Sequence, residues 1–367
     1  MKPGMIIAIA AASAGLSGRA LADTTVAAAK AFVAAATSKT IPYTGPTTGP
    51  KAVPGKFIVY VSTDQSNGGA RGVAKGVAAA AKAIGWRFRL IDGKGTAAGQ
   101  NAALSSAIAL KPAGIVLGGV DAVQSAPFIE QADKAGIKVV GWNASPRPGP
   151  IASPGVIYNV TQNSLDVAKA AALYAIAKSD GHANVVIFTT SEYAIAMAKS
   201  AEMAKTIKQC AGCKVLAVEN VPLGATATRM PQVTAALLSK FGKTWNYSLA
   251  INDLYYDYMA PGLSASGRKG DGPPYNVSAG DGSESAFQRI RSKQFQTATV
   301  AAPLELEGWQ CVDELNRAFA GQPPATETDP VHLFTPDNID QDGGKTNVFN
   351  PSNGYKAVFL KIWGKSA

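Results

Sequence analysis

Two asparagines, an aspartate and a tryptophan follow apolar stretches of the sequence directly, and together they could hold a molecule rich in hydroxyl groups. Asn143 and Asn252 each carry amide donors and an acceptor oxygen, whereas an ionised Asp281 only accepts hydrogen bonds. The Trp142 ring could cover C–H groups, because ligand pockets combine apolar walls with a few placed polar groups. These residue types predict a site for a small, uncharged, polar molecule.

Each of these residues also has a purely structural alternative. Trp142 could cap a hydrophobic core, and Asn252 with its neighbour could cap a helix N-terminus. Asp281 before a glycine is typical of a turn, as is Asn67 before two glycines. Arg229 at the start of a predicted helix could equally be solvated. Position relative to the predicted strands is what favours binding.

Residues that carry out catalysis are scarce. The chain has two histidines, His182 and His332, and no G-x-S-x-G or Walker A sequence. SNGGARG after the first predicted strand lacks the G-x-G-x-x-G order of a dinucleotide site. The run from Asn338 begins like a calcium loop, but its twelfth position is Phe349 where a glutamate is needed. We expect neither an enzyme nor a cofactor or metal site.

Residues 56–76 predict the kind of element that would position the polar side chains. The apolar run 57–61 is typical of a strand buried on both faces, and a polar loop over 62–69 follows it. Apolar residues then recur at helical spacing, at Val73, Val77, Ala81 and Ile84. This order places the loop at the carboxyl end of the strand, where open parallel sheets bind ligands.

The same unit repeats along the chain. The first predicted strands are 56–62, 86–91, 113–117 and 137–141, with helices near 70–84, 99–110 and 122–135. After residue 158, strands near 183–188, 214–219, 247–252 and 275–279 alternate with helices near 161–179, 192–208, 226–240 and 283–292. A strand at 296–301, a helix at 304–320 and a strand near 331–335 follow. This alternation predicts an α/β fold with two doubly wound parallel-sheet lobes, separated by a break near 142–158.

Residues 1–22 have the composition of a secretory signal peptide. Lys2 supplies the positive start, the apolar run 5–16 is shorter than the ~18 residues of a membrane span, and small residues precede Asp23. We expect cleavage after Ala22 and an exported protein; an uncleaved amphipathic start is the alternative. Residues 23–52 predict an alanine-rich helix followed by an extended, proline-rich linker.

The cysteines fit an oxidising compartment. Cys210 and Cys213 form CAGC between a predicted helix and a predicted strand. A redox-active C-x-x-C instead lies at a helix N-terminus, where the helix dipole lowers the thiol pKa. We therefore expect a structural disulfide, with Cys311 as a buried free thiol.

Length and charge limit the choice of partners. With 367 residues the chain can form two hydrophobic cores, and its net charge is +10. The one local basic cluster, at Arg289, Arg291 and Lys293, fits a solvated helix face and lacks interleaved aromatic residues. We expect no nucleic-acid partner.

The order of these motifs resembles that of the periplasmic sugar-binding proteins of ABC importers, of the ribose-binding type. The resemblance covers roughly residues 56–340. It rests on V-S-T closing the first strand, I-N-D at 251–253, S-A-G-D-G at 278–282, and the segment 299–309. The family implies two lobes joined by three crossings, with the ligand between them.

The resemblance implies a division of the chain in which both lobes are discontinuous. By analogy the crossings fall near Tyr158, Ala302 and Asp329. The expected parts are a signal peptide over 1–22, an arm and linker over 23–52, an N-terminal lobe of 53–157 plus 303–328, a C-terminal lobe of 158–302 plus 329–345, and a tail of 346–367.

The family's ligand-contacting positions carry over unevenly. Residues 62–67 match a loop that touches the sugar, but glycines follow where aromatics are frequent. Trp142 and Asn143 lie where the family has an acidic residue followed by an arginine, which together bind sugar hydroxyl groups. In this sequence Ala144 replaces that arginine. No arginine occurs over 192–201, where Tyr193 is the nearest substitute. The candidate ligand-binding residues are Ser62, Asp64, Gln65, Asn67, Trp142, Asn143, Tyr193, Arg229, Asn252 and Asp281.

The resemblance implies an exported, monomeric, periplasmic receptor that closes its lobes around a small sugar or sugar alcohol and delivers it to an ABC permease. The missing arginines and the glycine-containing loop favour a pentose or polyol over a hexose. An input protein for a chemoreceptor or sensor kinase is the main alternative. The ligand core of a repressor would need a helix-turn-helix, which residues 1–52 do not suggest. A doubly wound enzyme would have to work without histidine or a recognised nucleophile motif.

Overall fold

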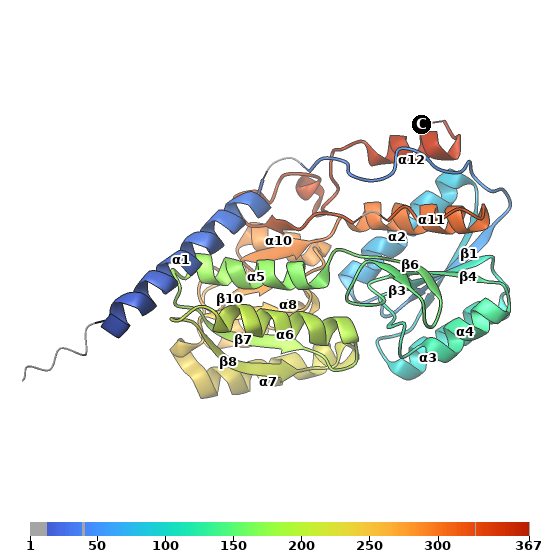
Figure 1. Ribbon diagram of the computed structural model, residues 1–367. Helices are drawn as coiled ribbons and strands as arrows, with labels where there is room; N and C mark the ends of the chain where they lie inside the picture. The colour runs from blue at the N-terminus through green and yellow to red at the C-terminus, as the bar shows by residue number, and fades with distance from the viewer. Residues whose placement is uncertain (1–12, 39–40, 327, 367) are drawn as a thin grey trace, which may run out of the picture.

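The computed structural model describes residues 13–38, 41–326 and 328–366. They form two lobes that lie side by side, each with a six-stranded sheet at its centre (Figure 1). Both sheets are parallel except for one antiparallel strand at one edge. The two predominantly parallel sheets confirm the predicted α/β fold class.

The first lobe contains the N-terminal sheet. In spatial order its strands are β2 (Arg87–Asp92), β1 (Phe57–Ser62), β3 (Gly114–Gly118), β4 (Lys138–Trp142), β6 (Val156–Val160) and β5 (Gly149–Ile151). Its helices are α2 (Gly68–Ile84), α3 (Ala97–Ala109), α4 (Ala126–Lys134), α11 (Leu304–Phe319) and α12 (Tyr355–Trp363).

Strand β1 is buried on both faces, as its apolar run predicts. Ile58 and Tyr60 pack in one hydrophobic cluster with α2 and α11, whereas Val59 and Val61 pack in another with α3 and α4. Helices therefore cover both faces of the sheet, and the loop after Ser62 emerges at its carboxyl edge.

The second lobe repeats the arrangement. In spatial order its strands are β12 (His332–Phe334), β11 (Ala298–Ala301), β10 (Tyr275–Ser278), β9 (Tyr247–Ala250), β7 (Asn184–Thr189) and β8 (Lys214–Asn220). Its helices are α5 (Ser164–Lys178), α6 (Ala194–Lys208), α7 (Thr226–Phe241), α8 (Leu254–Asp257), α9 (Ala260–Ala265) and α10 (Glu284–Ser292). Short 3₁₀ turns lie at Leu223–Ala225, Gly242–Thr244 and Gly344–Thr346.

The break predicted near 142–158 contains strands. β5 and β6 form an antiparallel pair, and β6 extends the first sheet beside β4 up to Val160. The crossing expected near Tyr158 therefore falls inside a strand, and the chain leaves this sheet after Val160. The glycines and prolines over 144–155 hid the strand in the sequence, because they dominate the local pattern.

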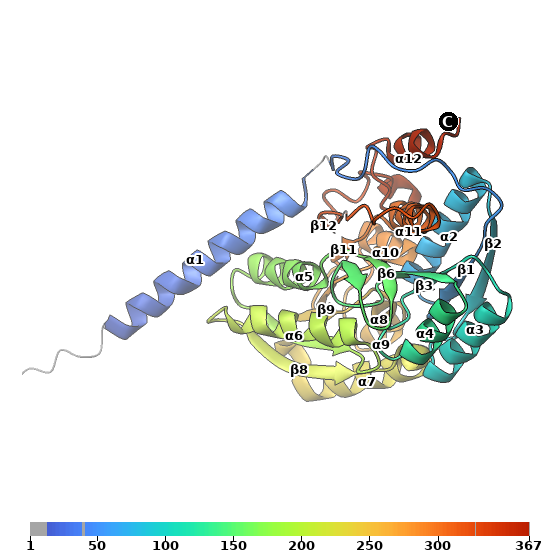
Figure 2. The same ribbon diagram turned by 45° about the vertical axis from the view of Figure 1, so that its right-hand side comes forward.

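The N-terminal arm touches both lobes. Helix α1 (Ser13–Ala36) packs against α5, and the segment 43–53 runs over the first lobe beside α12 (Figure 2). The first twelve residues of the predicted signal peptide lie outside the described residues, and α1 continues through the predicted cleavage position. Among the described residues, no helix combines the length and hydropathy of a membrane span.

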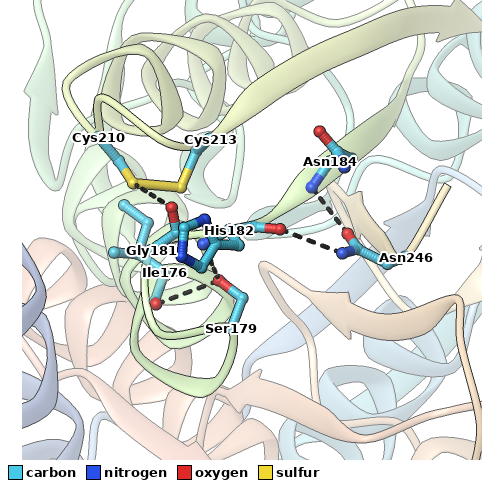
Figure 3. Close-up of a disulfide and its surroundings, with 8 residues drawn as sticks. All are labelled: Ile176, Ser179, Gly181, His182, Asn184, Cys210, Cys213 and Asn246. Atoms are coloured by element: carbon cyan, nitrogen blue, oxygen red, sulfur yellow. Dashed lines mark hydrogen bonds between the residues drawn. A yellow bond between two sulfur atoms is a disulfide. The ribbon is translucent and has the colours of Figure 1, made fainter. Parts of the chain in front are cut away.

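The predicted disulfide is confirmed. Cys210 and Cys213 are bonded, with their Cα atoms 5.3 Å apart, between the end of α6 and the start of β8 (Figure 3). Next to them, Asn246 joins two strand starts: its Oδ1 accepts from the Asn184 backbone N–H at 2.7 Å and its Nδ2 donates to the His182 carbonyl at 3.1 Å. Cys311 is free and buried, as expected. The disulfide thus clips the amino-terminal edge of the second sheet.

Replacing both bridged cysteines, Cys210→Ala with Cys213→Ala, should lower the free energy of unfolding of the second lobe by about 2 kcal/mol, because the bridge restricts the unfolded chain over a short loop. Urea denaturation of oxidised wild type and variant measures the difference. Reduced wild type should unfold like the variant. Equal midpoints for the oxidised wild type and the variant would contradict a stabilising clip.

Candidate functional site

A cavity lies between the two lobes, where the carboxyl ends of both sheets face each other. Its free volume is about 50 Å³ in this arrangement of the lobes, below the roughly 300–1,000 Å³ typical of ligand pockets. Residues from the first lobe that line it are Thr63, Asn67, Gly119, Trp142 and Asn143. Residues from the second are Tyr193, Ile195, Ala196, Lys199, Leu223, Ile251, Asn252 and Asp281.

Six of the ten predicted ligand-binding residues line this one cavity. They are Asn67, Trp142, Asn143, Tyr193, Asn252 and Asp281. Trp142 is the last residue of β4, and the others come from loops after β1, β4, β7, β9 and β10. The rule that parallel strands present ligand groups at their carboxyl ends therefore predicted that they lie together. Their contact with a ligand stays a prediction.

Four predicted residues do not line the cavity, because they serve the loop structure or face solvent. Ser62 Oγ accepts from Gln65 Nε2 at 2.7 Å, so these two side chains satisfy each other. Asp64 Oδ1 accepts from the Ser66 backbone N–H at 2.8 Å. Arg229 lies exposed on α7, which agrees with its solvated alternative.

Asn67 and Asn252 combine structural and cavity roles. Asn67 Oδ1 accepts from the Ala70 N–H at 3.0 Å and so caps α2, while Asn252 Oδ1 accepts from the Leu254 N–H at 3.2 Å. Both residues still line the cavity. The capping alternative and the binding prediction are therefore compatible for these two residues.

Trp142 is held by an acidic residue that the sequence did not reveal. Its Nε1 donates to Glu307 Oε2 at 2.6 Å, and Glu307 lies on α11 with 1% of its surface exposed. Burial, and after it the nearby Asp329 carboxylate, raise the pKa of Glu307 to about 8, against the lowering effect of the indole hydrogen bond. Glu307 also lines a narrower space that adjoins the cavity through Asn143, Lys199 and Asp281.

Lys199 is a second residue that the sequence did not reveal. Its Nζ donates to the carbonyl oxygens of Ala279 (2.7 Å) and Ile251 (3.3 Å), so it ties the loops that carry Asp281 and Asn252. Burial lowers the pKa of Lys199, whereas Asp281 and Glu307 raise it. This lysine lies on the stretch 192–201, where the family resemblance implied an arginine.

Asp253 fixes the position of Asp281. Its Oδ2 accepts backbone N–H groups from Asp281 (3.1 Å), Gly282 (2.9 Å) and Ser283 (2.9 Å). The Asp253 carboxylate thereby holds the loop from which the Asp281 side chain lines the cavity. Burial raises the pKa of Asp281 to about 6, partly offset by Lys199.

The two lobes make direct polar contacts beside the cavity. Tyr193 from the second lobe lies with its OH 2.9 Å from Thr63 Oγ1, and it accepts from Gln100 Nε2 at 2.8 Å. Asp121 Oδ2 accepts the Ala194 backbone N–H at 2.9 Å. The lobes are therefore closed on each other in this structure.

The two glycines that begin α2 permit this closure. A Cβ on Gly69 would overlap the Asp281 carboxylate, and one on Gly68 would overlap Ser283. Aromatics near this position, frequent in the resembling family, would not fit this closed arrangement. The absence of side chains at 68 and 69 is thus required by the approach of Asp281 and Ser283 to α2.

The calcium-like run is used for local structure. Asn338 Oδ1 accepts from the Thr335 N–H at 2.8 Å, and Asp340 Oδ1 pairs with Arg291 Nη2 at 3.0 Å. Within the described part of the chain, no group of three or more histidine, cysteine, aspartate or glutamate side chains could hold a metal ion.

Comparison with known proteins identifies the class. The family model described as "Periplasmic binding protein domain" matches residues 58–323, so the chain belongs to this family. Membership confirms the expected resemblance and places the chain among binding proteins, not enzymes. No curated protein matches the chain in sequence.

Solved structures share the fold at low sequence identity. A solute-binding protein of an ABC transporter from Agrobacterium vitis with bound allitol has a TM-score of 0.67 and 21% identity, covering 78% of this chain and 97% of its own. The binding protein of the arabinose ABC transporter from Shewanella sp. ANA-3, bound to L-arabinofuranose, gives 0.67 and 16%, covering 83% and 98%. A second Agrobacterium vitis protein, bound to D-tagatopyranose, gives 0.69 and 15%, covering 80% and 99%.

Gly69→Ala should weaken ligand binding about tenfold or more, because the added Cβ meets the Asp281 carboxylate only when the lobes are closed. The melting temperature of the unliganded protein should change little. Gly272→Ala is the matched control, since its Cβ would meet the nearest atom at an ordinary 3.4 Å. Calorimetric titration of all three proteins gives the result, and unchanged affinity in Gly69→Ala would argue against closure over Asp281.

Glu307→Gln should flatten the pH dependence of stability between about pH 5 and 9. The pKa of Glu307 is raised in the folded protein from its ordinary 4.5 to about 8, so its contribution is fully present below 4.5 and is lost as the pH rises through 8. Wild type should therefore lose more unfolding free energy over this interval than the variant. Parallel curves in urea denaturation at several pH values would show that Glu307 titrates normally.

Proposed function

We propose that this protein captures a small, uncharged sugar or sugar alcohol between its lobes and delivers it to an ABC transporter permease. The observation that carries the proposal is the convergence of Trp142, Asn252 and Asp281 on one cavity between two closed lobes. An indole face, an amide and a carboxylate match the C–H faces and hydroxyl groups of a carbohydrate.

The charges around the cavity favour a neutral guest. Lys199 and Asp281 lie near each other, and Glu307, with a pKa of about 8, is largely protonated at neutral pH. A ligand that carried a net charge would have to leave water without a free counter-charge among these three groups. A hydroxyl-rich neutral molecule meets no such cost.

Within this class, a pentose or polyol is favoured over a hexose. Positions 68 and 69 carry no aromatic platform, because Asp281 and Ser283 approach α2 there. Ala144 lies where one arginine was expected, and no arginine occurs over 192–201, where the second was expected. A bidentate guanidinium contact to neighbouring hydroxyl groups is therefore missing. The ligands named for structural neighbours include allitol, L-arabinofuranose and the hexose D-tagatopyranose, so they support a sugar or polyol and leave the preference for a pentose to the residues alone.

The proposal includes export to the periplasm and action as a monomer. The composition of residues 1–22 supports cleavage after Ala22. A lobe closes by bending where the chain crosses between sheets, so we propose crossings after Val160, near Ala302 and near Asp329. Gln162 Nε2 donates to the Pro330 carbonyl at 2.7 Å, which holds the first and third of these segments together.

A thermal-shift panel of pentoses, hexoses, alditols, amino acids and nucleosides tests the proposal. Stabilisation by pentoses or alditols is expected, because a ligand that binds only the folded protein raises its stability. Stabilisation by amino acids or nucleosides alone would reject it.

For the best ligand, Asn252→Ala and Asp281→Ala should each cost about 1–3 kcal/mol of binding free energy, because hydroxyl groups lose their partners. Arg229→Ala, which alters an exposed side chain away from the cavity, is the control and should bind like wild type. Unchanged affinity in both cavity variants would mean that the ligand binds elsewhere.

A further inference from the structure

Both ends of the described chain cross between the lobes, in addition to the three crossings proposed after Val160, near Ala302 and near Asp329. The N-terminal arm begins on the second lobe. Ala29 and Ala36 are buried against α5, and Phe32 and Val33 pack against the same hydrophobic cluster. Ile41 still belongs to the second lobe, since it packs on a cluster that contains Phe287 of α10, Phe334 of β12 and Phe349.

Directly after Ile41, the arm lies on the first lobe. The Tyr43 ring packs edge-on against Phe359 of α12, with centroids 6.3 Å apart. Further along, Asn316 of α11, fully buried, accepts from the Val53 N–H at 2.9 Å and donates to the Pro50 carbonyl at 3.1 Å. Arg317 Nη2 donates to the Thr48 carbonyl at 2.8 Å, and Trp86 Nε1 donates to the Val53 carbonyl at 2.7 Å.

The C-terminal segment makes the same crossing. Phe349 is buried with the second-lobe cluster, whereas the next residue, Asn350, donates through Nδ2 to Glu305 Oε2 of α11 at 3.0 Å. Helix α12 then completes the first-lobe core, where Trp363 stacks on Trp309 with centroids 5.4 Å apart. Trp363 Nε1 donates to Asp313 Oδ1 at 2.7 Å.

The two terminal crossings lie against each other. The Ala52 N–H donates to the Trp363 carbonyl at 3.0 Å, and the arm and the C-terminal segment line one groove through Tyr43, Asp342 and Asn353. Residues 41–53 and 349–363 therefore form one two-stranded connection between the lobes, which we call the brace. Both parts lie outside residues 58–323, the region that matches the family.

We propose that the brace limits how far the lobes separate when the cleft opens. The reach of the chain is the physical reason: two residues span at most ~7 Å, so Ile41 and Tyr43 cannot follow different lobes far apart. Phe349 and Asn350 are adjacent and have even less reach. Opening beyond this limit must pull one buried anchor from its lobe, which costs the burial of an aromatic ring or several hydrogen bonds.

The brace also sets ligand affinity, a part of the inference that rests on the proposed function. An unliganded protein that opens less has a larger fraction of near-closed molecules, and apparent affinity rises with that fraction. Slackening the brace should therefore weaken binding without touching any residue that lines the cavity.

Slack is introduced by inserting six Gly/Ser residues between Pro42 and Tyr43, between Phe349 and Asn350, or at both places. The same insertion after Gly136 is the matched control, because this first-lobe turn is open and a Cβ on Gly136 would meet nothing within 4 Å. Spin labels on the exposed residues Glu130 of α4 and Lys208 of α6 report the distance between the lobes in the unliganded protein.

The double insertion should lengthen the interlobe distance by at least one residue's reach, ~3.5 Å, and broaden its distribution, while the control matches wild type. Affinity for the best sugar from the panel should fall about threefold or more. An unchanged distance distribution would overturn the proposal that the brace limits lobe separation. If wild type binds no sugar, the proposed function fails, yet the distance measurement still shows whether the brace limits opening of the lobes.

A folding defect is separated by a second variant, in which the double insertion carries a protease recognition sequence at the Pro42 site. The uncut protein folds with both connections in place, and cutting it afterwards releases the arm's crossing while the crossing at Phe349 stays slack. The distance should exceed that of wild type before cutting, because both crossings are slack, and should lengthen further after cutting. A cut protein with the wild-type distance would contradict the inference.

Discussion

The approach of the Asp281 carboxylate to the start of α2 is the constraint on which the rest of the site depends. Asp281 belongs to the second lobe and Gly69 to the first, and a side chain at residue 69 would exclude the carboxylate. Asp253 fixes the backbone of the loop by accepting three successive N–H groups, so the loop that carries Asp281 is held in place. A ligand between the lobes therefore meets a preformed acceptor, and closure depends on a backbone approach that only glycine permits.

Buried ionisable groups around this contact keep the cavity close to neutral. Lys199 links two loop carbonyls and faces Asp281, whereas Glu307 binds the Trp142 indole and has its pKa raised to about 8 by burial. A buried charge is tolerated only when it is paired or hydrogen-bonded. The cluster thus orients Trp142 and the two strand-end loops while leaving no unpaired charge for a ligand to neutralise.

Much of the fold follows from local sequence, because buried strands show continuous apolar runs: β1 was predicted at 56–62 and lies at 57–62. Strand β6 was missed because glycines and prolines precede it. In the site, the sequence predicted that Trp142, Asn252 and Asp281 lie close together, since each lies at the carboxyl end of a predicted strand. Lys199 and Glu307 could not, because each lies inside a helix, and only packing across the cleft determines which helical residues face it. The two terminal crossings were equally hidden, since they depend on tertiary contacts such as those between residues 263 and 266 positions apart.

We propose that the two lobes meet over one uncharged, hydroxyl-rich ligand and that the chain ends hold the lobes near each other. The most direct test is a crystal structure of the protein with the most stabilising pentose or alditol. We predict the ligand between the lobes, with its C–H face on Trp142 and its hydroxyl groups bonded to Asn252 and Asp281. A ligand bound outside this cavity, or lobes that close without contacting it, would contradict the central claim.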